Sequence, residues 1–99
     1  MQILNKENLE QMYSKAKIAF KRCIEDEENE FLKNEINIPT NSIVMKEEFI
    51  KIKYIKIDTE NYVIETKIQL VSQADDVIGS YIYYENEKGI AIDDSLIFE

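Results

Sequence analysis

The sequence predicts an α+β domain in which one long N-terminal helix packs on a four-stranded antiparallel meander sheet, in the order α-β-β-β-β. Between about residues 5 and 34, apolar residues recur every three or four positions, as on one side of an amphipathic helix. From about residue 49 to residue 98 the apolar residues alternate instead, which is typical of strands. With 99 residues, 44% of them hydrophobic, the chain is long enough to form a single domain, 1–99, with its own core.

The predicted helix has a clear start. Asn5 is an N-cap candidate, and Leu4 and Leu9 stand at the positions of a hydrophobic staple. Cys23 lies in the apolar stripe, where a small buried thiol is the usual occupant. The acidic segment 25–30 interrupts the stripe, so we expect the helix to kink there or to project past the sheet. The stripe consists of Leu9, Met12, Tyr13, Ala16, Ala19, Phe20, Cys23, Ile24 and Phe31.

Four strand-like runs follow a connection that contains the single proline, Pro39. They cover residues 49–57, 62–71, 80–84 and 90–98. Two short turns, 58–61 and 85–89, join the runs into hairpins, and Gly89 supplies a positive φ in the second turn. A change in the apolar phase at Tyr54 predicts a β-bulge in the first strand. Short connections favour antiparallel neighbours, and a sheet with one apolar face needs the helix as its cover.

The composition excludes several kinds of site. The chain has no histidine, so it cannot form a Ser-His-Asp or Cys-His catalytic centre or a His-ligated metal site. Its single cysteine, Cys23, rules out an intramolecular disulfide, and its two glycines are too few for a phosphate-binding loop. We therefore expect no cofactor. We also expect a cytoplasmic protein, because the chain has neither a leader peptide nor an apolar run long enough to span a membrane.

Charge is distributed unevenly along the chain. Residues 1–57 contain ten acidic and ten basic side chains, whereas residues 58–99 contain ten acidic side chains against two basic ones, Lys67 and Lys88. The net charge of −8 therefore arises in the last three strands and their turns. Such a field repels nucleic acid and membrane and attracts basic proteins. We expect a basic protein partner and a monomer or weak homodimer; alternatively, the acids only keep the protein soluble.

Carboxylates and tyrosines of the C-terminal half form the predicted partner-binding surface. Rigid aromatic area beside negative charge suits an interface with a protein rich in Lys and Arg. In a second interpretation, some of these tyrosines fill the sheet core and expose only their hydroxyls. The predicted contact residues are Asp75, Asp76, Tyr81, Tyr83, Glu85, Glu87 and Asp93.

Asp94 stands in phase with the apolar residues Ile92 and Leu96 of the last run. A carboxylate there needs a backbone amide or a Tyr hydroxyl as its partner, or a bulge that turns it outward. Alternatively, Asp94 serves proton transfer in a pocket between helix and sheet. Adjacent strand residues point to opposite faces, so Asp93 and Asp94 do not chelate a metal together. We predict no metal site and no catalytic residue, with Asp94 as the pocket carboxylate of the alternative function.

The C-terminal segment 81–99, YIYYENEKGIAIDDSLIFE, is similar in style to small bacterial immunity proteins that neutralise polymorphic toxins. The long helix on a curved meander resembles cystatin-like and NTF2-like domains. Cystatin inhibitors carry Gln-x-Val-x-Gly, whereas residues 69–73 read QLVSQ and lack the glycine, so protease inhibition is not carried over. The resemblance implies a non-enzymatic immunity protein that occludes the basic active site of a nuclease-type toxin. The alternative is an NTF2-like small-molecule-binding protein or enzyme with a pocket around Asp94.

Overall fold

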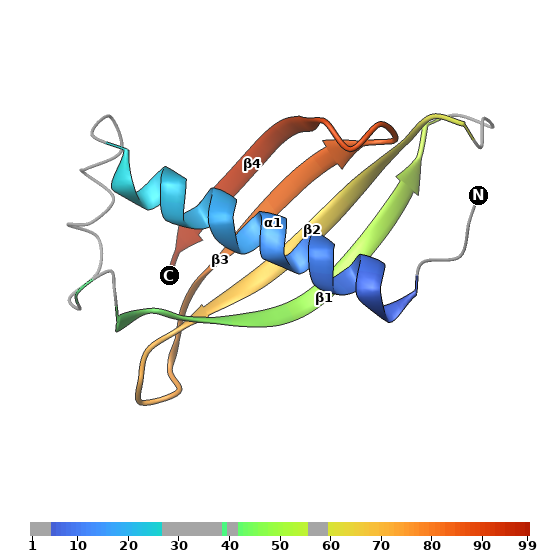
Figure 1. The fold of residues 1–99 in the computed structure, drawn as a ribbon. Helices are drawn as coiled ribbons and strands as arrows, with labels where there is room; N and C mark the ends of the chain where they lie inside the picture. The colour runs from blue at the N-terminus through green and yellow to red at the C-terminus, as the bar shows by residue number, and fades with distance from the viewer. Residues whose placement is uncertain (1–4, 27–38, 40–41, 56–59) are drawn as a thin grey trace.

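The computed structural model has the predicted α+β architecture (Figure 1). It describes residues 5–26, 39, 42–55 and 60–99. One helix and four strands follow each other as α1 (Lys6–Glu25), β1 (Val44–Tyr54), β2 (Tyr62–Val71), β3 (Val77–Asn86) and β4 (Ala91–Phe98). The strands form one antiparallel sheet in the order β1-β2-β3-β4, and α1 crosses one face of it. The predicted fold class and strand order are confirmed.

α1 begins at the predicted cap and ends earlier than predicted. The Asn5 side-chain oxygen accepts a hydrogen bond from the Asn8 backbone N–H at 2.8 Å, which satisfies one of the unpaired donors of the first turn. The helix ends at Glu25, and Asp26 already has an extended backbone. The end falls where the acidic segment interrupts the apolar stripe, because a longer helix would have no apolar side to bury there. The predicted helical residues 27–34 lie outside the described residues.

The core lies between α1 and the sheet. Phe20 of α1 meets Tyr81 of β3 edge to face, with ring centroids 5.6 Å apart. Their removal from water, together with that of the aliphatic side chains around them, is the main favourable contribution to folding. The buried core cluster consists of Ala16, Phe20, Ile24, Ile43, Ile68, Leu70 and Tyr81.

The register of the sheet decides which residues face the helix. The predicted alternation in β2 is confirmed, since its buried residues on the helix side are Ile64, Thr66, Ile68 and Leu70. Tyr81 of β3 pairs with Ile68 of β2 on one side and with Leu96 of β4 on the other. Tyr83 pairs with Asp94 two residues further on, so Tyr81, Tyr83, Leu96 and Asp94 all belong to the helix face of the sheet.

The strand boundaries differ from the prediction in β1 and β3. β1 begins at Val44 and ends at Tyr54, and its register shift lies between Glu47 and Phe49 rather than at Tyr54. β3 includes residues that were predicted as loop and turn, because they pair with β2 and β4. The apolar phase alone therefore misplaced the bulge. Leu4, Phe31 and Ile57, predicted in the staple, the helix stripe and the first strand, lie outside the described residues.

Candidate binding groove

A groove of about 680 Å³ separates α1 from the β3–β4 side of the sheet. It forms because α1 packs mainly on β2, β3 and β1 and leaves the first part of β4, residues 91–94, exposed, whereas Leu96 and Phe98 still pack against the core. The helix wall includes Lys15, Ile18, Arg22, Cys23 and Asp26. The sheet wall includes Tyr81, Tyr83, Asp93, Asp94 and Leu96. The groove therefore combines two cations on the helix, carboxylates on both walls and the half-buried aromatic side chain of Tyr83 on β3.

Asp94 has a tyrosine hydroxyl as its partner, one of the arrangements predicted for it. The Tyr81 hydroxyl donates a hydrogen bond to Asp94 Oδ2 at 2.9 Å. Burial of Tyr81, followed by its hydrogen bond to Asp94 and the charge of that carboxylate, raises the pKa of Tyr81 far above its usual value. Asp94 itself is exposed although it lies on the helix face, because α1 does not cover β4 at this position. This carboxylate stands on the wall of an open groove.

Cys23 is a half-buried thiol on the helix wall. Burial raises the pKa of the Cys23 thiol, and the negative charges of Asp94 and Asp26 raise it further. A thiol with a raised pKa is protonated at neutral pH and is a weak nucleophile. These surroundings favour a packing role for Cys23, in agreement with its position in the apolar stripe.

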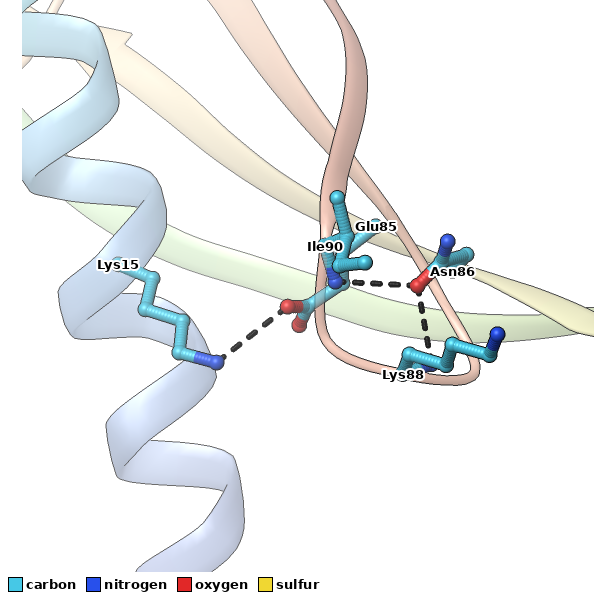
Figure 2. Close-up of polar contacts among 5 residues, drawn as sticks. All are labelled: Lys15, Glu85, Asn86, Lys88 and Ile90. Carbon is cyan, nitrogen blue, oxygen red and sulfur yellow. Dashed lines mark hydrogen bonds and ion pairs between the residues drawn. The ribbon is translucent and has the colours of Figure 1, made fainter.

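Two of the predicted partner contacts are buried, and their assignment to an exposed surface is wrong. Tyr81 is 0% and Glu85 is 1% exposed. Both lie on the helix face of β3, where α1 covers the sheet. The Glu85 carboxylate points toward α1, and Lys15 Nζ lies 3.4 Å from its Oε2 (Figure 2). The alternation in β2 could have predicted this burial. Antiparallel pairing places Tyr81 opposite Ile68 and Glu85 opposite Ile64, both of which lie on the helix face.

The turn between β3 and β4 is held by Asn86 (Figure 2). Its side-chain oxygen accepts the backbone N–H of Lys88 at 2.9 Å and that of Ile90 at 3.0 Å. Gly89 has a φ of 75°, so the predicted positive φ is confirmed. These contacts fix the backbone of the turn that directly follows Glu85.

The turn acids predicted as part of one surface lie at opposite ends of the sheet. Asp75 and Asp76 lie in the turn between β2 and β3, whereas Glu87 lies in the turn between β3 and β4. β3 is 10 residues long, so the two turns are roughly 30 Å apart (Figure 1). Asp75 also forms an ion pair with Lys46 of β1, which partly neutralises that end. A small interface could therefore not contact all three of these acids at once.

Four of the eight predicted site residues do come together at the groove: Tyr81, Tyr83, Asp93 and Asp94. The helix residues that face them were not predicted. Lys15, Ile18 and Arg22 follow each other at spacings of three and four, which places them on one side of a helix. That spacing, next to the apolar stripe, was the signal that could have identified the helix wall of the groove.

Comparison of the chain with protein families, with curated proteins and with solved structures gave no match. Within the part of the chain that the structure describes, no three His, Cys, Asp or Glu side chains are grouped so that they could hold a metal ion. Nor does any helix of these residues have the length and apolar character needed to cross a membrane.

Proposed function

We propose that this chain is a non-enzymatic binding protein that receives a basic segment of a protein partner at the groove between α1 and β4. Its most concrete form is an immunity protein that occludes the active site of a nuclease-type toxin. The observation that carries the proposal is the open groove with Asp93 and Asp94 on its sheet wall, because it combines concave shape, aromatic area and negative charge at one place.

The charge balance of the groove favours a basic partner. Asp26, Asp93 and Asp94 line it together with the cations Lys15 and Arg22. Lys15 is engaged by the buried carboxylate of Glu85, which adds a fourth acid beside the groove. Among the residues that the structure describes, four carboxylates stand against two cations, a balance that attracts Lys and Arg side chains and repels a phosphate backbone. This local excess agrees with the −8 charge of the whole chain.

The protonation of Tyr81 and Cys23 argues against their use as a base or a nucleophile in the groove. The raised pKa values of Tyr81 and Cys23 leave the phenol and the thiol protonated at neutral pH. Neither group is then a base or a strong nucleophile. The Tyr81 hydroxyl instead orients the Asp94 carboxylate, as expected for a fixed contact with a cationic side chain.

The second candidate is an NTF2-like small-molecule-binding protein or enzyme, and the volume of the groove favours it. About 680 Å³ falls within the usual range for small-molecule sites. Such sites enclose most of the ligand surface, however, whereas Ile18 is 50% exposed on one wall and Asp93 and Asp94 are exposed on the other. A groove this open suits a segment of a larger partner better than an enclosed ligand.

The experiment that tests the proposal is growth protection in cells that express the product of the neighbouring reading frame. We expect that product to be toxic alone and harmless with this chain. The Asp93→Lys/Asp94→Lys double variant should lose protection, because it reverses the charge of the sheet wall. The matched Asp75→Lys/Asp76→Lys variant changes the same number of charges at the other end of the sheet and should still protect. Full protection by a folded Asp93→Lys/Asp94→Lys protein contradicts the proposal.

A further inference from the structure

β4 forms an edge of the sheet, and its pairing with β3 determines which of its backbone N–H and C=O groups point away from the sheet. β4 pairs with β3, and no other strand of residues 42–55 and 60–99 lies beside it (Figure 1). The Glu99 N–H donates to the Ile78 carbonyl at 2.9 Å. Because hydrogen-bonding direction alternates along an antiparallel strand, Ile97 also points its backbone groups toward β3. Leu96 and Phe98 therefore point their N–H and C=O groups away from the sheet.

The two edges of the sheet differ in their protection. At β1 the register shift between Glu47 and Phe49 interrupts the strand, and charges occur along its length at Lys46, Glu47, Glu48, Lys51 and Lys53. Bulges and charges of this kind hinder the pairing of a further strand. The β3–β4 pairing also has a register shift, between Tyr84 and Glu85, but it lies near the start of β4. From Ser95 to Phe98 the strand pairs regularly and carries no charged side chain. Its apolar side chains are accessible, with Ile92 52% and Ile97 56% exposed.

One outward donor of β4 is already satisfied. The Asp94 backbone N–H donates to the side-chain oxygen of Asp93 at 2.8 Å. A strand added beside β4 therefore finds its donors at Leu96 and Phe98, next to the groove. Alternate side chains of such a strand would point toward the helix side and enter the groove.

We infer that β4 receives an extended basic segment of the partner as a fifth strand of the sheet, an inference that rests on the proposed function. Charge favours a basic segment over a second copy of this chain as the added strand. A second copy would bring together two chains that each carry a net charge of −8, and this repulsion disfavours it. A Lys or Arg directly opposite Asp93 or Asp94 on the added strand is instead favourable. Backbone hydrogen bonds supply the affinity and the acidic groove supplies the selection.

Three synthetic ten-residue peptides and amide hydrogen exchange of the whole chain test this inference. The first peptide alternates Lys and Val, and the second has Glu in place of each Lys. The third has as many lysines as the first but two adjacent central prolines, so that in either register one proline faces β4 and cannot donate. We expect the Lys-Val peptide to slow exchange of the Leu96 and Phe98 amides while the outward amides of β1 stay unchanged. It should bind at least about tenfold more tightly than the proline peptide, and the Glu peptide should not bind.

Several results would overturn strand addition. Equal binding of both lysine peptides, or unchanged exchange at Leu96 and Phe98 with the Lys-Val peptide bound, refutes it while leaving the attraction of a basic partner intact. Slow exchange of these amides without peptide also refutes it: in a dimer the occupant is a second copy, and in a monomer it is another part of the chain. Failure of the Lys-Val peptide to bind refutes it as well, and growth protection then decides the proposed function separately.

Discussion

The two halves of the sheet differ in how they meet the helix. β2 lies under α1, and its alternate residues from Ile64 to Leu70 are buried. The first part of β4 is not covered by α1, so Asp94 is exposed although it lies on the same face as Ile68. The same alternation therefore leads to burial in one half and to a groove wall in the other. Periodicity assigns a residue to a face, and only the position of the helix decides whether that face is closed.

The strongest test of the covered half is Phe20→Ala. Phe20 is 3% exposed and packs against Tyr81, so the substitution should lower the free energy of unfolding by about 3 to 5 kcal/mol by leaving a cavity. Ile18→Ala, on the same helix but half exposed at the groove, is the matched control and should cost less than about 1 kcal/mol. Urea titration measures both. Equal losses would show that the helix does not divide the sheet into a covered and an open half.

Reversing a charge should cost more stability at a position covered by the helix than at an exposed one. Glu85→Lys places a second cation beside Lys15 in a buried position and should cost about 3 kcal/mol or more. Asp76→Lys changes an exposed turn and should stay within about 0.5 kcal/mol. Melting curves of both variants check this. A Glu85→Lys protein as stable as the parent would contradict the burial of that carboxylate.

Alkaline pH should destabilise the protein through Tyr81. An unfolded tyrosine has a pKa of about 10, whereas in the folded protein burial and Asp94 raise the pKa of Tyr81. The folded state then keeps a proton that the unfolded state loses, so stability is complete below about pH 9 and falls as the pH rises past about 10. Tyr81→Phe should cost about 1 kcal/mol at neutral pH by losing the bond to Asp94.

The pH dependence of Tyr81→Phe provides the control for that prediction. Its unfolding free energy should fall less steeply between about pH 9 and 11 than that of the parent. A residual slope is expected because the pKa values of Tyr13 and Cys23 are raised as well. Identical slopes in chemical denaturation of the two proteins would assign the alkaline effect to groups other than Tyr81.

The smallest expected effect concerns a hydroxyl under the helix. Thr66 is 0% exposed, and its Oγ1 has no hydrogen-bond partner among the described residues. Thr66→Val keeps the shape and removes a buried polar group, so it should leave stability unchanged or raise it by up to about 1 kcal/mol. A clear loss in urea titration would indicate that the hydroxyl has a partner in solution, such as a bound water.

The sequence predicted the fold well because its signals are local. The apolar stripe of α1, the cap at Asn5 and the alternation of β2 each depend on neighbouring residues. The end of the helix at Glu25 was signalled only by the acidic segment that follows it. The bulge between Glu47 and Phe49 was not predictable, because it depends on which partner residues β1 meets in β2.

The candidate site was predicted in part. Asp94 and its tyrosine partner followed from the strand alternation, and Tyr83 and Asp93 do line the groove. The predicted acidic surface combined residues that are close in sequence, whereas in the structure Asp75 and Asp76 lie at the opposite end of β3 from Glu87, and Glu85 is buried. The predicted meander already implied that the turns on either side of β3 lie at opposite ends. The volume and openness of the groove depend on where α1 crosses the sheet, which no local pattern specifies.

Association kinetics test most directly the central claim that a basic partner binds at the open half. The partner used is the product of the neighbouring reading frame, which the proposed function expects to be the toxin. Its association rate is measured at low and high salt for the parent chain and for two charge-matched variants. We predict that Asp93→Lys/Asp94→Lys slows association at low salt by roughly tenfold or more, that salt reduces the difference, and that Asp75→Lys/Asp76→Lys associates nearly as fast as the parent. Equal slowing by both variants would mean that the overall charge attracts the partner, and would contradict a binding site at the groove.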